Sequence, residues 1–518
     1  YPGLRSTIVV CTLVYNMCAS ERVLVVFPMP GRSHTTLGDA VVRSLLKGGH
    51  DVTYITTATQ LTNDRLTVIN VTPDGDQYDP VLNVDELLQS SISSQHEMTT
   101  GTKYVVRALR HEHVQLLMRN KLVSFDVVVA EWFYSRLLAP LGEVFQCPLV
   151  WYSPVDAFWM NLQLVHESPN PAYAVDLQAK VASEIPDVKE RALRIWRQMY
   201  MTAWQYYFVY YVEGPLYYEL YQLAIQRRGR TPPLYEELIH SGALLLINSQ
   251  PILGQNLPLP NSAKYIGGHH LGTSEPLTKE LQDILTRSKY GVIYVNFGAS
   301  ISRGIPQKTV QLLLKMFTQL EQDIIWKYSE KLDYVPANVH LVDWVPQQAV
   351  LRHPNTTMMI SHAGYLSYIE AMYYGVPIVG IPVAGDQLLS MEHAAARGRG
   401  IKVHYSDKLA STLRAAVNEI FANYSYRSSA MEASSMLRKR LVPPSQELRH
   451  WVELVMSTGG ARLLRSPAIS LNIMERYHLD VIVLVCLMYW FLTKVVKLVK
   501  VYWNDYGTDC DTEKQKSQ

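Results

Sequence analysis

The sequence predicts an α/β protein built from two doubly wound domains that face each other across a cleft. Three observations support this fold class. Short runs rich in β-branched residues alternate with helical patterns, the alternation starts again from residue 243, and 518 residues exceed what one hydrophobic core normally organises. Hydrophobic residues make up 48% and charged residues 18% of the chain, so the composition is that of a folded protein.

The first set of elements is expected between residues 22 and 152. Its strands are Arg22–Phe27, Asp51–Ile55, Leu66–Val71, Asp126–Ala130 and Pro148–Tyr152, and its helices are Leu37–Lys47 and Tyr104–Arg119. The second set has strands at Ala243–Asn248, Gly291–Phe297, Asp323–Lys327, Thr356–Ile360 and Val376–Ile381, and helices at Gln307–Leu320, Tyr365–Tyr374 and Leu409–Phe421. Such strands form parallel sheets, whose carboxyl ends face the ligand.

The boundary between the two domains is expected in the segment Pro251–Pro260. This segment carries three prolines and little periodicity, which is typical of a linker. We therefore predict an N-terminal domain over residues 21–255 and a C-terminal domain over residues 256–456.

Both ends of the chain indicate a secretory route. Residues 1–20 are interpreted as a signal peptide, because Arg5 precedes the apolar run Ile8–Tyr15 and small residues follow. A transmembrane helix is predicted over residues 479–501, where an uncharged run continues into lysines whose stems can snorkel. Alternatively, this segment is a buried amphipathic helix.

The lysines that follow the uncharged run place residues 502–518 in the cytosol and the body in the lumen. Lys514 and Lys516 resemble a dilysine retrieval signal, so we expect a single-pass protein of the endoplasmic reticulum membrane. Asn70, Asn355 and Asn423 begin glycosylation sequons.

Overall charge excludes one class of partner. The chain has 48 basic and 46 acidic residues, or a net charge of +2, whereas a nucleic-acid binder normally presents a basic face. No spacing of cysteine and histidine typical of a metal site is present, so no metal is predicted.

The most informative motif runs from Trp344 to Gln387 and resembles the signature of the UDP-glycosyltransferase family. The residues in register are Trp344, Pro346, Gln347, His353, Pro354, His362, Gly364, Ser367, Glu370, Gly375, Pro377, Pro382, Asp386 and Gln387. Segments at 28–34 and 451–466 resemble the family's N-terminal motif and its insect-type C-terminal segment. The resemblance implies two Rossmann-like domains of the GT-B type, the first binding an acceptor and the second a UDP-sugar.

The residue types suit the UDP roles that the resemblance implies. Trp344 offers an indole on which uracil can stack, Gln347 can bond the base or ribose, and Glu370 can accept from ribose hydroxyls. A strand that ends before a helix places free backbone N–H groups at the diphosphate, where His362, Gly364 and Ser367 lie.

The sugar and phosphate positions include departures from the family pattern. Asp386 and Gln387 are implied to hold the sugar hydroxyls. Ala299 occupies the position where the family usually has a phosphate-binding serine, and Ser300 is the candidate to bind phosphate in its place. Ala363 replaces a glycine, and Ser390 stands where many relatives have asparagine.

His34 is the expected general base. It follows the first strand in the segment 31–34, so it faces the cleft, and an imidazole is suited to accept a proton near neutral pH. Glu131 follows the strand Asp126–Ala130 and is the expected partner of the other ring nitrogen, where many relatives have aspartate.

The aromatic segment 153–240 has two interpretations, helix core with a surface near the membrane, or one wall of an apolar acceptor pocket. The expected function is inverting transfer of a hexose, most often glucose, from a UDP-sugar to a hydroxyl of a small lipophilic acceptor, in a detoxification role. The alternative donor sugars, after glucose, are glucuronate and galactose. No cofactor is expected, and oligomerisation stays open. The alternative is a non-catalytic UDP-sugar-binding membrane protein that partners active relatives.

Overall fold

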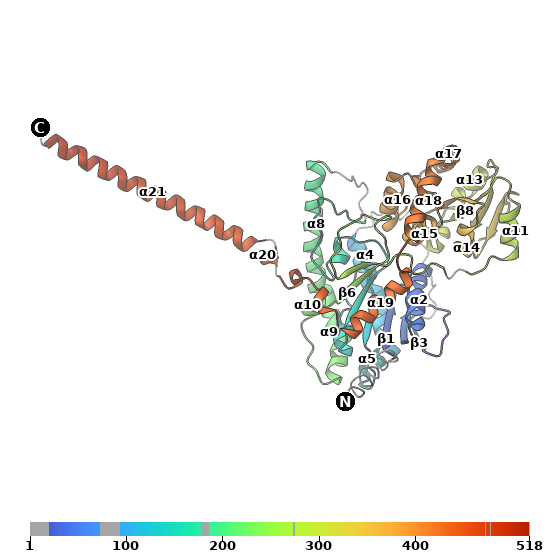
Figure 1. The fold of residues 1–518 in the computed structure, drawn as a ribbon, viewed down its shortest axis with the longest axis horizontal. Helices are drawn as coiled ribbons and strands as arrows, with labels where there is room; N and C mark the ends of the chain where they lie inside the picture. The colour runs from blue at the N-terminus through green and yellow to red at the C-terminus, as the bar shows by residue number, and fades with distance from the viewer. Residues whose placement is uncertain are drawn as a thin grey trace, which may run out of the picture. The chain divides into compact units, whose positions relative to one another are not determined.

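The computed structural model describes residues 20–72, 94–177, 186–272, 275–471, 473–476 and 478–516. The chain divides into a body that ends at Arg465 and a second unit, Ser466–Gln518 (Figure 1). Nearly all of the predicted signal peptide lies outside the described residues. The predicted α/β class is confirmed, because the body contains two parallel sheets with helices packed on them.

The first sheet has seven parallel strands in the order β3-β2-β1-β4-β5-β6-β7. They are β1 (Arg22–Phe27), β2 (Asp51–Thr56), β3 (Leu66–Asn70), β4 (Val127–Glu131), β5 (Leu149–Ser153), β6 (Leu244–Ile247) and β7 (Ala263–Tyr265). The strand order reverses between β1 and β4, which pair directly along Val23–Val26. Loops that leave two such neighbouring strands in opposite directions create the crevice in which this fold class binds ligands.

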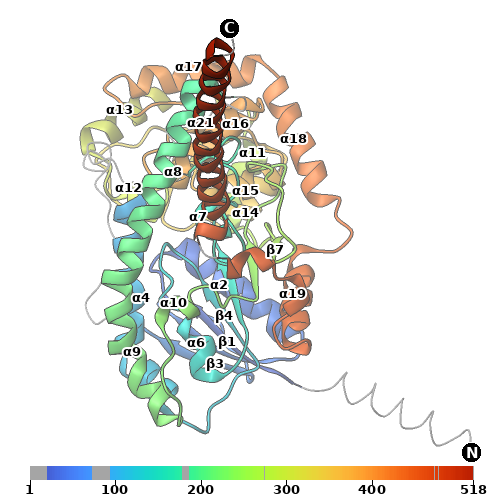
Figure 2. The ribbon, with the colours of Figure 1, turned by 90° about the vertical axis from the view of Figure 1, so that its left-hand side faces the viewer.

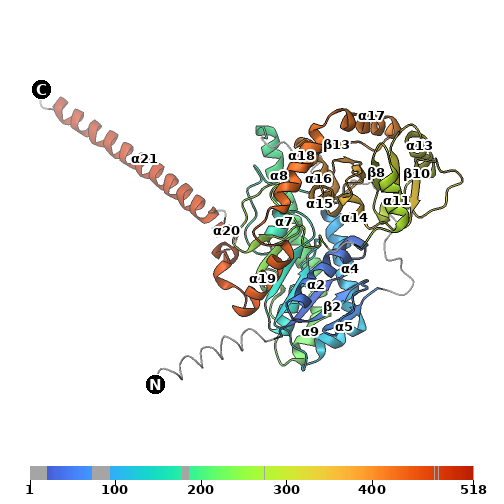
Figure 3. The same ribbon diagram turned by 45° about the vertical axis from the view of Figure 1, so that its right-hand side comes forward.

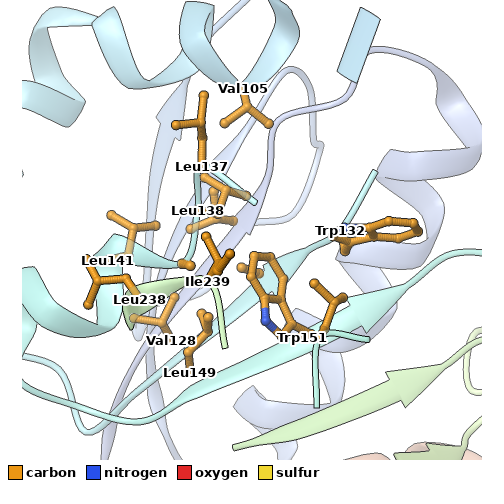
Figure 4. Close-up of a cluster of buried hydrophobic side chains, with 14 of the residues drawn as sticks. Val105, Val128, Trp132, Leu137, Leu138, Leu141, Leu149, Trp151, Leu238 and Ile239 are labelled. Carbon is orange, nitrogen blue, oxygen red and sulfur yellow. The ribbon is translucent and has the colours of Figure 1, made fainter. Parts of the chain in front are cut away.

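Helices cover both faces of the first sheet. They include α2 (Arg32–Lys47), α4 (Ser94–Arg110), α5 (Glu112–Arg119), α6 (Pro140–Phe145), α7 (Trp159–Leu162), α8 (Val188–Phe208), the π-helix η1 (Val209–Glu213), α9 (Gly214–Arg227) and α10 (Tyr235–Leu238). Figure 4 shows part of the core on one face, a cluster that includes Val105 of α4, Val128 of β4 and Trp151 of β5. A second core lies on the other face beneath α2.

The second sheet has six parallel strands in the order β10-β9-β8-β11-β12-β13. They are β8 (Val292–Asn296), β9 (Asp323–Lys327), β10 (Val339–Val342), β11 (Thr356–Ser361), β12 (Ile378–Gly380) and β13 (Gly400–Lys402). Its helices are α11 (Lys279–Arg287), α12 (Ala299–Ser302), α13 (Gln307–Phe317), α14 (Gln347–Arg352), α15 (Tyr365–Tyr373), α16 (Asp386–Ala396), α17 (Leu409–Ala422) and α18 (Ser425–Arg438) (Figure 3). Here the order reverses between β8 and β11.

The two lobes exchange chain segments near the predicted boundary at residue 255. The loop 251–260 joins β6 to β7 within the first sheet, and the chain leaves that sheet only after Tyr265. Leu253 in this loop nevertheless packs into the core of the second lobe. Prolines break periodicity whether or not the chain returns to the same sheet, which is why the loop resembled a linker.

The last helix of the body returns to the first lobe. This helix, α19 (Pro444–Ser457), packs on α2 through Leu448 and Val452, both of which are fully buried. The short 3₁₀ helices η2 (Arg462–Leu464) and η3 (Pro467–Ser470) follow at the junction with the second unit.

The second unit contains α20 (Ile473–Arg476) and α21 (Leu479–Lys516). By length and composition alone, the segment Leu479–Trp503 of α21 could cross a membrane. This segment contains the predicted span at residues 479–501.

The aromatic segment between residues 186 and 240 presents much of its apolar surface to solvent. Helices α8 and α9 run along one side of the first lobe (Figure 2). Trp196 is 65% and Tyr211 is 65% exposed, whereas Phe208 and Tyr217 belong to the first-lobe core. The arrangement of these residues therefore favours helix core plus surface over a wall beside the expected base.

Candidate active site

Two pairs of residues lie at the points where the strand order of each sheet reverses. In the first lobe, His34 follows β1 and Glu131 ends the neighbouring strand β4. In the second lobe, Gly298 follows β8 and His362 follows the neighbouring strand β11. Both pairs therefore occupy the carboxyl-edge crevice in which doubly wound folds bind ligands.

His34 and Glu131 form the buried pair that the sequence predicts. His34 Nδ1 lies 2.5 Å from Glu131 Oε1, and the Glu131 side chain is fully buried, whereas that of His34 is 18% exposed. His34 lies in the first turn of α2, whereas the sequence predicted a turn before the helix. A carboxylate on Nδ1 favours the tautomer that has its proton there, which leaves the Nε2 lone pair available as a base.

Aromatic side chains next to this pair come from a segment that the sequence analysis did not single out. Phe133 meets the His34 ring edge to face, with centroids 5.5 Å apart, and Tyr134 lies 5.4 Å from Phe133. Both rings are half-buried, and Tyr134 has a φ of 57°. A non-glycine residue in this left-handed region costs free energy, so the surrounding packing must hold the loop in place.

The second lobe provides a helix N-terminus at its crevice. Gly364 precedes α15, and His362 stands just before it at the end of β11. Burial and the charge of Lys327 together lower the pKa of His362 to about 4, against a backbone hydrogen bond with Asn296 that raises it. The imidazole is therefore neutral at pH 7 and can offer a hydrogen bond but no positive charge. Ala363, which replaces the family's glycine, has a φ of 63°, a conformation that glycine adopts more readily.

Gln347, Ser367 and Glu370 form one hydrogen-bonded group. Gln347 Nε2 donates to Glu370 Oε2 at 2.5 Å and to Ser367 Oγ at 3.2 Å. Gln347 Oε1 in turn accepts from Asn296 Nδ2 at 2.6 Å. Buried His270, from the connector between the lobes, has its Nε2 3.3 Å from Glu370 Oε1. The sequence predicted that the first three residues bind UDP, but not that they contact one another or His270.

Trp344 is exposed and is flanked by two cations. Its side chain is 46% exposed, and its indole N–H donates to Glu275 Oε2 at 3.0 Å. The Arg32 guanidinium of the first lobe lies 4.6 Å from the centre of its ring system, and Lys327 Nζ lies 5.1 Å from it. A uracil ring that stacked here would therefore share the indole with these cations.

Asp386 and Gln387 begin α16 beside α15. Asp386 Oδ2 accepts a 2.7 Å hydrogen bond from the Tyr365 amide in the first turn of α15. Gln387 Oε1 accepts from the Val383 amide at 2.8 Å and so fixes the preceding loop. Ser390 donates back to the Asp386 carbonyl at 2.7 Å and is buried within the helix. The side chain of Ser300 lies outside the described residues.

Glu97 is a further carboxyl group at the cleft, and the sequence analysis missed it. It lies on α4 of the first lobe, within electrostatic reach of His34 and of Asp386 in the second lobe. Burial and the Asp386 carboxylate raise the pKa of Glu97 to about 7, and His34 opposes this rise. Burial also raises the pKa of Asp386, against the amide of Tyr365 and the charge of His34.

The fold of the body is that of the GT-B glycosyltransferases. The chain superposes on the calicheamicin glycosyltransferase CalG4 with a TM-score of 0.53 and 18% identity, over 85% of this chain and 98% of that one. It also superposes on a UDP-glucosyltransferase from Polygonum tinctorium with a TM-score of 0.56 and 14% identity, over 85% and 99%. The predicted GT-B fold is thereby confirmed.

The sequence assigns the family within this class. The family described as UDP-glucoronosyl and UDP-glucosyl transferase matches residues 22–516, so the chain belongs to that family and is an enzyme. UDP-glucosyltransferase 2 of Dactylopius coccus is 25% identical over 95% of each chain. UDP-glucuronosyltransferase 2A3 of Mus musculus is 27% identical over 72% of this chain and 68% of that one. Membership of this family means that the enzyme transfers a sugar from a UDP-sugar. The names of the relatives include both glucosyl- and glucuronosyltransferases, so they do not specify the sugar.

Substitution of Gly298 by alanine is expected to lower UDP affinity about tenfold and to destabilise the fold. Gly298 has a φ of 77°, and an added Cβ would lie 3.0 Å from His362 Cε1. The backbone strain costs about 1–3 kcal/mol, and the imidazole must move from the helix N-terminus. Calorimetric titration with UDP and urea unfolding measure the two effects.

Gly229→Ala is the matched control, because Gly229 has a φ of 81° and an added Cβ there meets nothing within 4 Å. It should lower stability without changing UDP affinity. Equal UDP affinity in Gly298→Ala and the control would contradict the predicted role of His362 at the diphosphate.

Proposed function

We propose that this enzyme transfers glucose from UDP-glucose to a hydroxyl group of a small lipophilic acceptor, with inversion at the anomeric carbon. The observation that carries the proposal is the 2.5 Å contact of His34 Nδ1 with buried Glu131, at the point where the first sheet reverses its strand order. A histidine held in this way is suited to deprotonate an alcohol at neutral pH.

The reaction is a single displacement. His34 Nε2 accepts the proton of the acceptor hydroxyl as the oxygen forms its bond to the anomeric carbon. The bond from that carbon to the UDP oxygen breaks on the opposite face, and UDP leaves with the electron pair. Glu131 then stabilises the imidazolium across the 2.5 Å contact.

The second lobe carries the groups proposed to bind UDP and to stabilise its departure. Trp344 stacks on the uracil, and Gln347 and Glu370 bind the ribose. The N-terminus of α15 with His362 and Ser367 receives the diphosphate, because helix N-termini favour anions. Asp386 and Gln387 hold the sugar hydroxyls. The mechanism uses no metal or cofactor, and Lys327 adds positive charge near His362.

The acceptor is proposed to lie against the half-buried rings of Phe133 and Tyr134. Phe133 contacts the His34 ring directly, so an apolar molecule packed on it brings its hydroxyl close to Nε2. Aromatic side chains provide large apolar contact area at low entropic cost, which suits lipophilic hydroxyl compounds such as phenols and sterols.

We propose that the enzyme resides in the endoplasmic reticulum membrane with its body in the lumen. The apolar helix Leu479–Trp503 and the lysines that follow its uncharged part support this location. Among the sequons, exposed Asn423 suits glycosylation. In contrast, Asn355 Nδ2, the atom that a glycan would take, donates to the Leu285 carbonyl at 2.8 Å.

Turnover of UDP-glucose with a panel of phenols and sterols tests the proposal. The full chain in detergent or a lipid nanodisc should release UDP in step with formation of a β-glucoside, which mass spectrometry and NMR identify. UDP binding without glycoside formation across the panel would instead favour a non-catalytic binding protein.

A further inference from the structure

Glu97 lies on the face of α4 that packs against the first lobe. It precedes Gly101 and Val105 at intervals of four residues, so the three share one face of the helix. Val105 is 1% exposed in the first-lobe core. At Gly101, an added Cβ would lie 2.0 Å from the Phe133 carbonyl oxygen, so α4 packs directly on the chain beyond Glu131. Glu97 therefore lies one helical turn from the contact with Phe133, within electrostatic reach of His34 and Asp386.

The Glu97 carboxyl has no partner that neutralises it. Within the described ranges no hydrogen bond or ion pair is present on this side chain, which is half-buried. The charged groups that act on it are Asp386, from α16 of the second lobe, and His34, from α2. His34 is already paired with Glu131. The sugar end of the cleft thus holds more carboxyl groups than cations.

Two carboxyl groups on opposite sides of a cleft discriminate between sugars by charge. Hydroxyl groups of a neutral hexose donate hydrogen bonds to carboxylates. A hexuronate adds its own carboxylate to a partly desolvated space, where repulsion between like charges is poorly screened. With a pKa of about 7, Glu97 is partly ionised near neutral pH and carries a fractional negative charge there.

We infer that Glu97 is a specificity-determining residue that favours neutral UDP-hexoses and excludes UDP-hexuronates. The inference rests on the proposed function and deepens it. The named relatives include both glucosyl- and glucuronosyltransferases, so family membership leaves this choice open. Glu97 provides a physical basis for it in this chain.

The test compares kcat/KM for UDP-glucose and UDP-glucuronate in the full-length enzyme and three variants. Glu97→Gln keeps the shape and removes the charge, so it should lower the preference for UDP-glucose about tenfold, through faster use of UDP-glucuronate. Glu97→Asp keeps the charge and should retain most of the preference. Glu112→Gln removes an exposed carboxylate from α5 and should leave both values unchanged.

Calorimetric binding of the two UDP-sugars gives a second readout that needs no turnover. Weaker binding of UDP-glucuronate in wild type, relieved in Glu97→Gln, would support the inference even if the enzyme transferred neither sugar. An unchanged ratio in Glu97→Gln, or a ratio that falls only through loss of UDP-glucose use, would overturn it. Absence of glucosyl transfer in wild type would contradict the proposed function alone.

Discussion

Replacement of His34 by alanine is expected to lower kcat about a thousandfold and to leave the affinity for UDP unchanged. The imidazole is the group proposed to take the acceptor proton, and it belongs to the first lobe. The predicted UDP contacts lie in the second lobe, around Gln347 and Glu370. Steady-state kinetics with UDP-glucose and a calorimetric titration with UDP separate the two effects.

His113→Ala is the control, since His113 is an exposed imidazole on α5, away from the cleft. It should match wild type in both measurements. A His34→Ala enzyme that retained more than a tenth of wild-type kcat would refute the assignment of the base.

The Glu131→Gln variant is expected to lose about a hundredfold in kcat or more. An amide keeps the shape of the side chain but removes the negative charge that stabilises the imidazolium. If the amide nitrogen turns towards Nδ1, the imidazole proton moves to Nε2 and the ring can no longer act as a base. Glu131→Asp keeps the charge, shortens the side chain by one methylene and should recover part of the loss.

Kinetics of the three enzymes, with UDP affinity and thermal unfolding as checks on folding, provide the measurement. Glu131 is fully buried, so a loss of folded protein must be separated from a loss of chemistry. Equal kcat in wild type and Glu131→Gln would show that the 2.5 Å contact is structural only.

The sequence predicted the central strands well, because they are buried on both faces. Arg22–Phe27 and Asp323–Lys327 have the predicted bounds, and their apolar runs leave little freedom in placing the ends. The short strands β7, β10 and β13 were not predicted, since three or four residues carry almost no periodicity. Their positions depend on the neighbouring strand.

Helix starts were harder to predict than strands. The helix expected from Tyr104 begins at Ser94, and one helix expected up to Arg119 is two, α4 and α5. Glu97 therefore fell outside any expected element. A prediction of the longer helix would have placed the Glu97 carboxyl on the same buried face as Val105. A carboxyl group on a buried helix face is the sequence signal that could have identified Glu97 as a candidate functional residue.

The sequence also predicted that His34 and Glu131 come together, because both follow strands whose carboxyl ends share one edge. It did not predict which carboxylates face each other across the cleft. The proximity of Glu97 to Asp386 requires the relative placement of two lobes, which no local pattern encodes. The same applies to Arg32, whose contact with Trp344 joins the lobes.

The most direct test of the central claim, that His34 is the general base, varies the acidity of the acceptor. An aliphatic alcohol needs a base to lose its proton, whereas a phenol that is already ionised at the assay pH does not. His34→Ala should lower the transfer rate about a thousandfold with the alcohol and less than about tenfold with the ionised phenol. An equal loss with both acceptors, or no loss with either, would contradict the role of His34 in proton transfer.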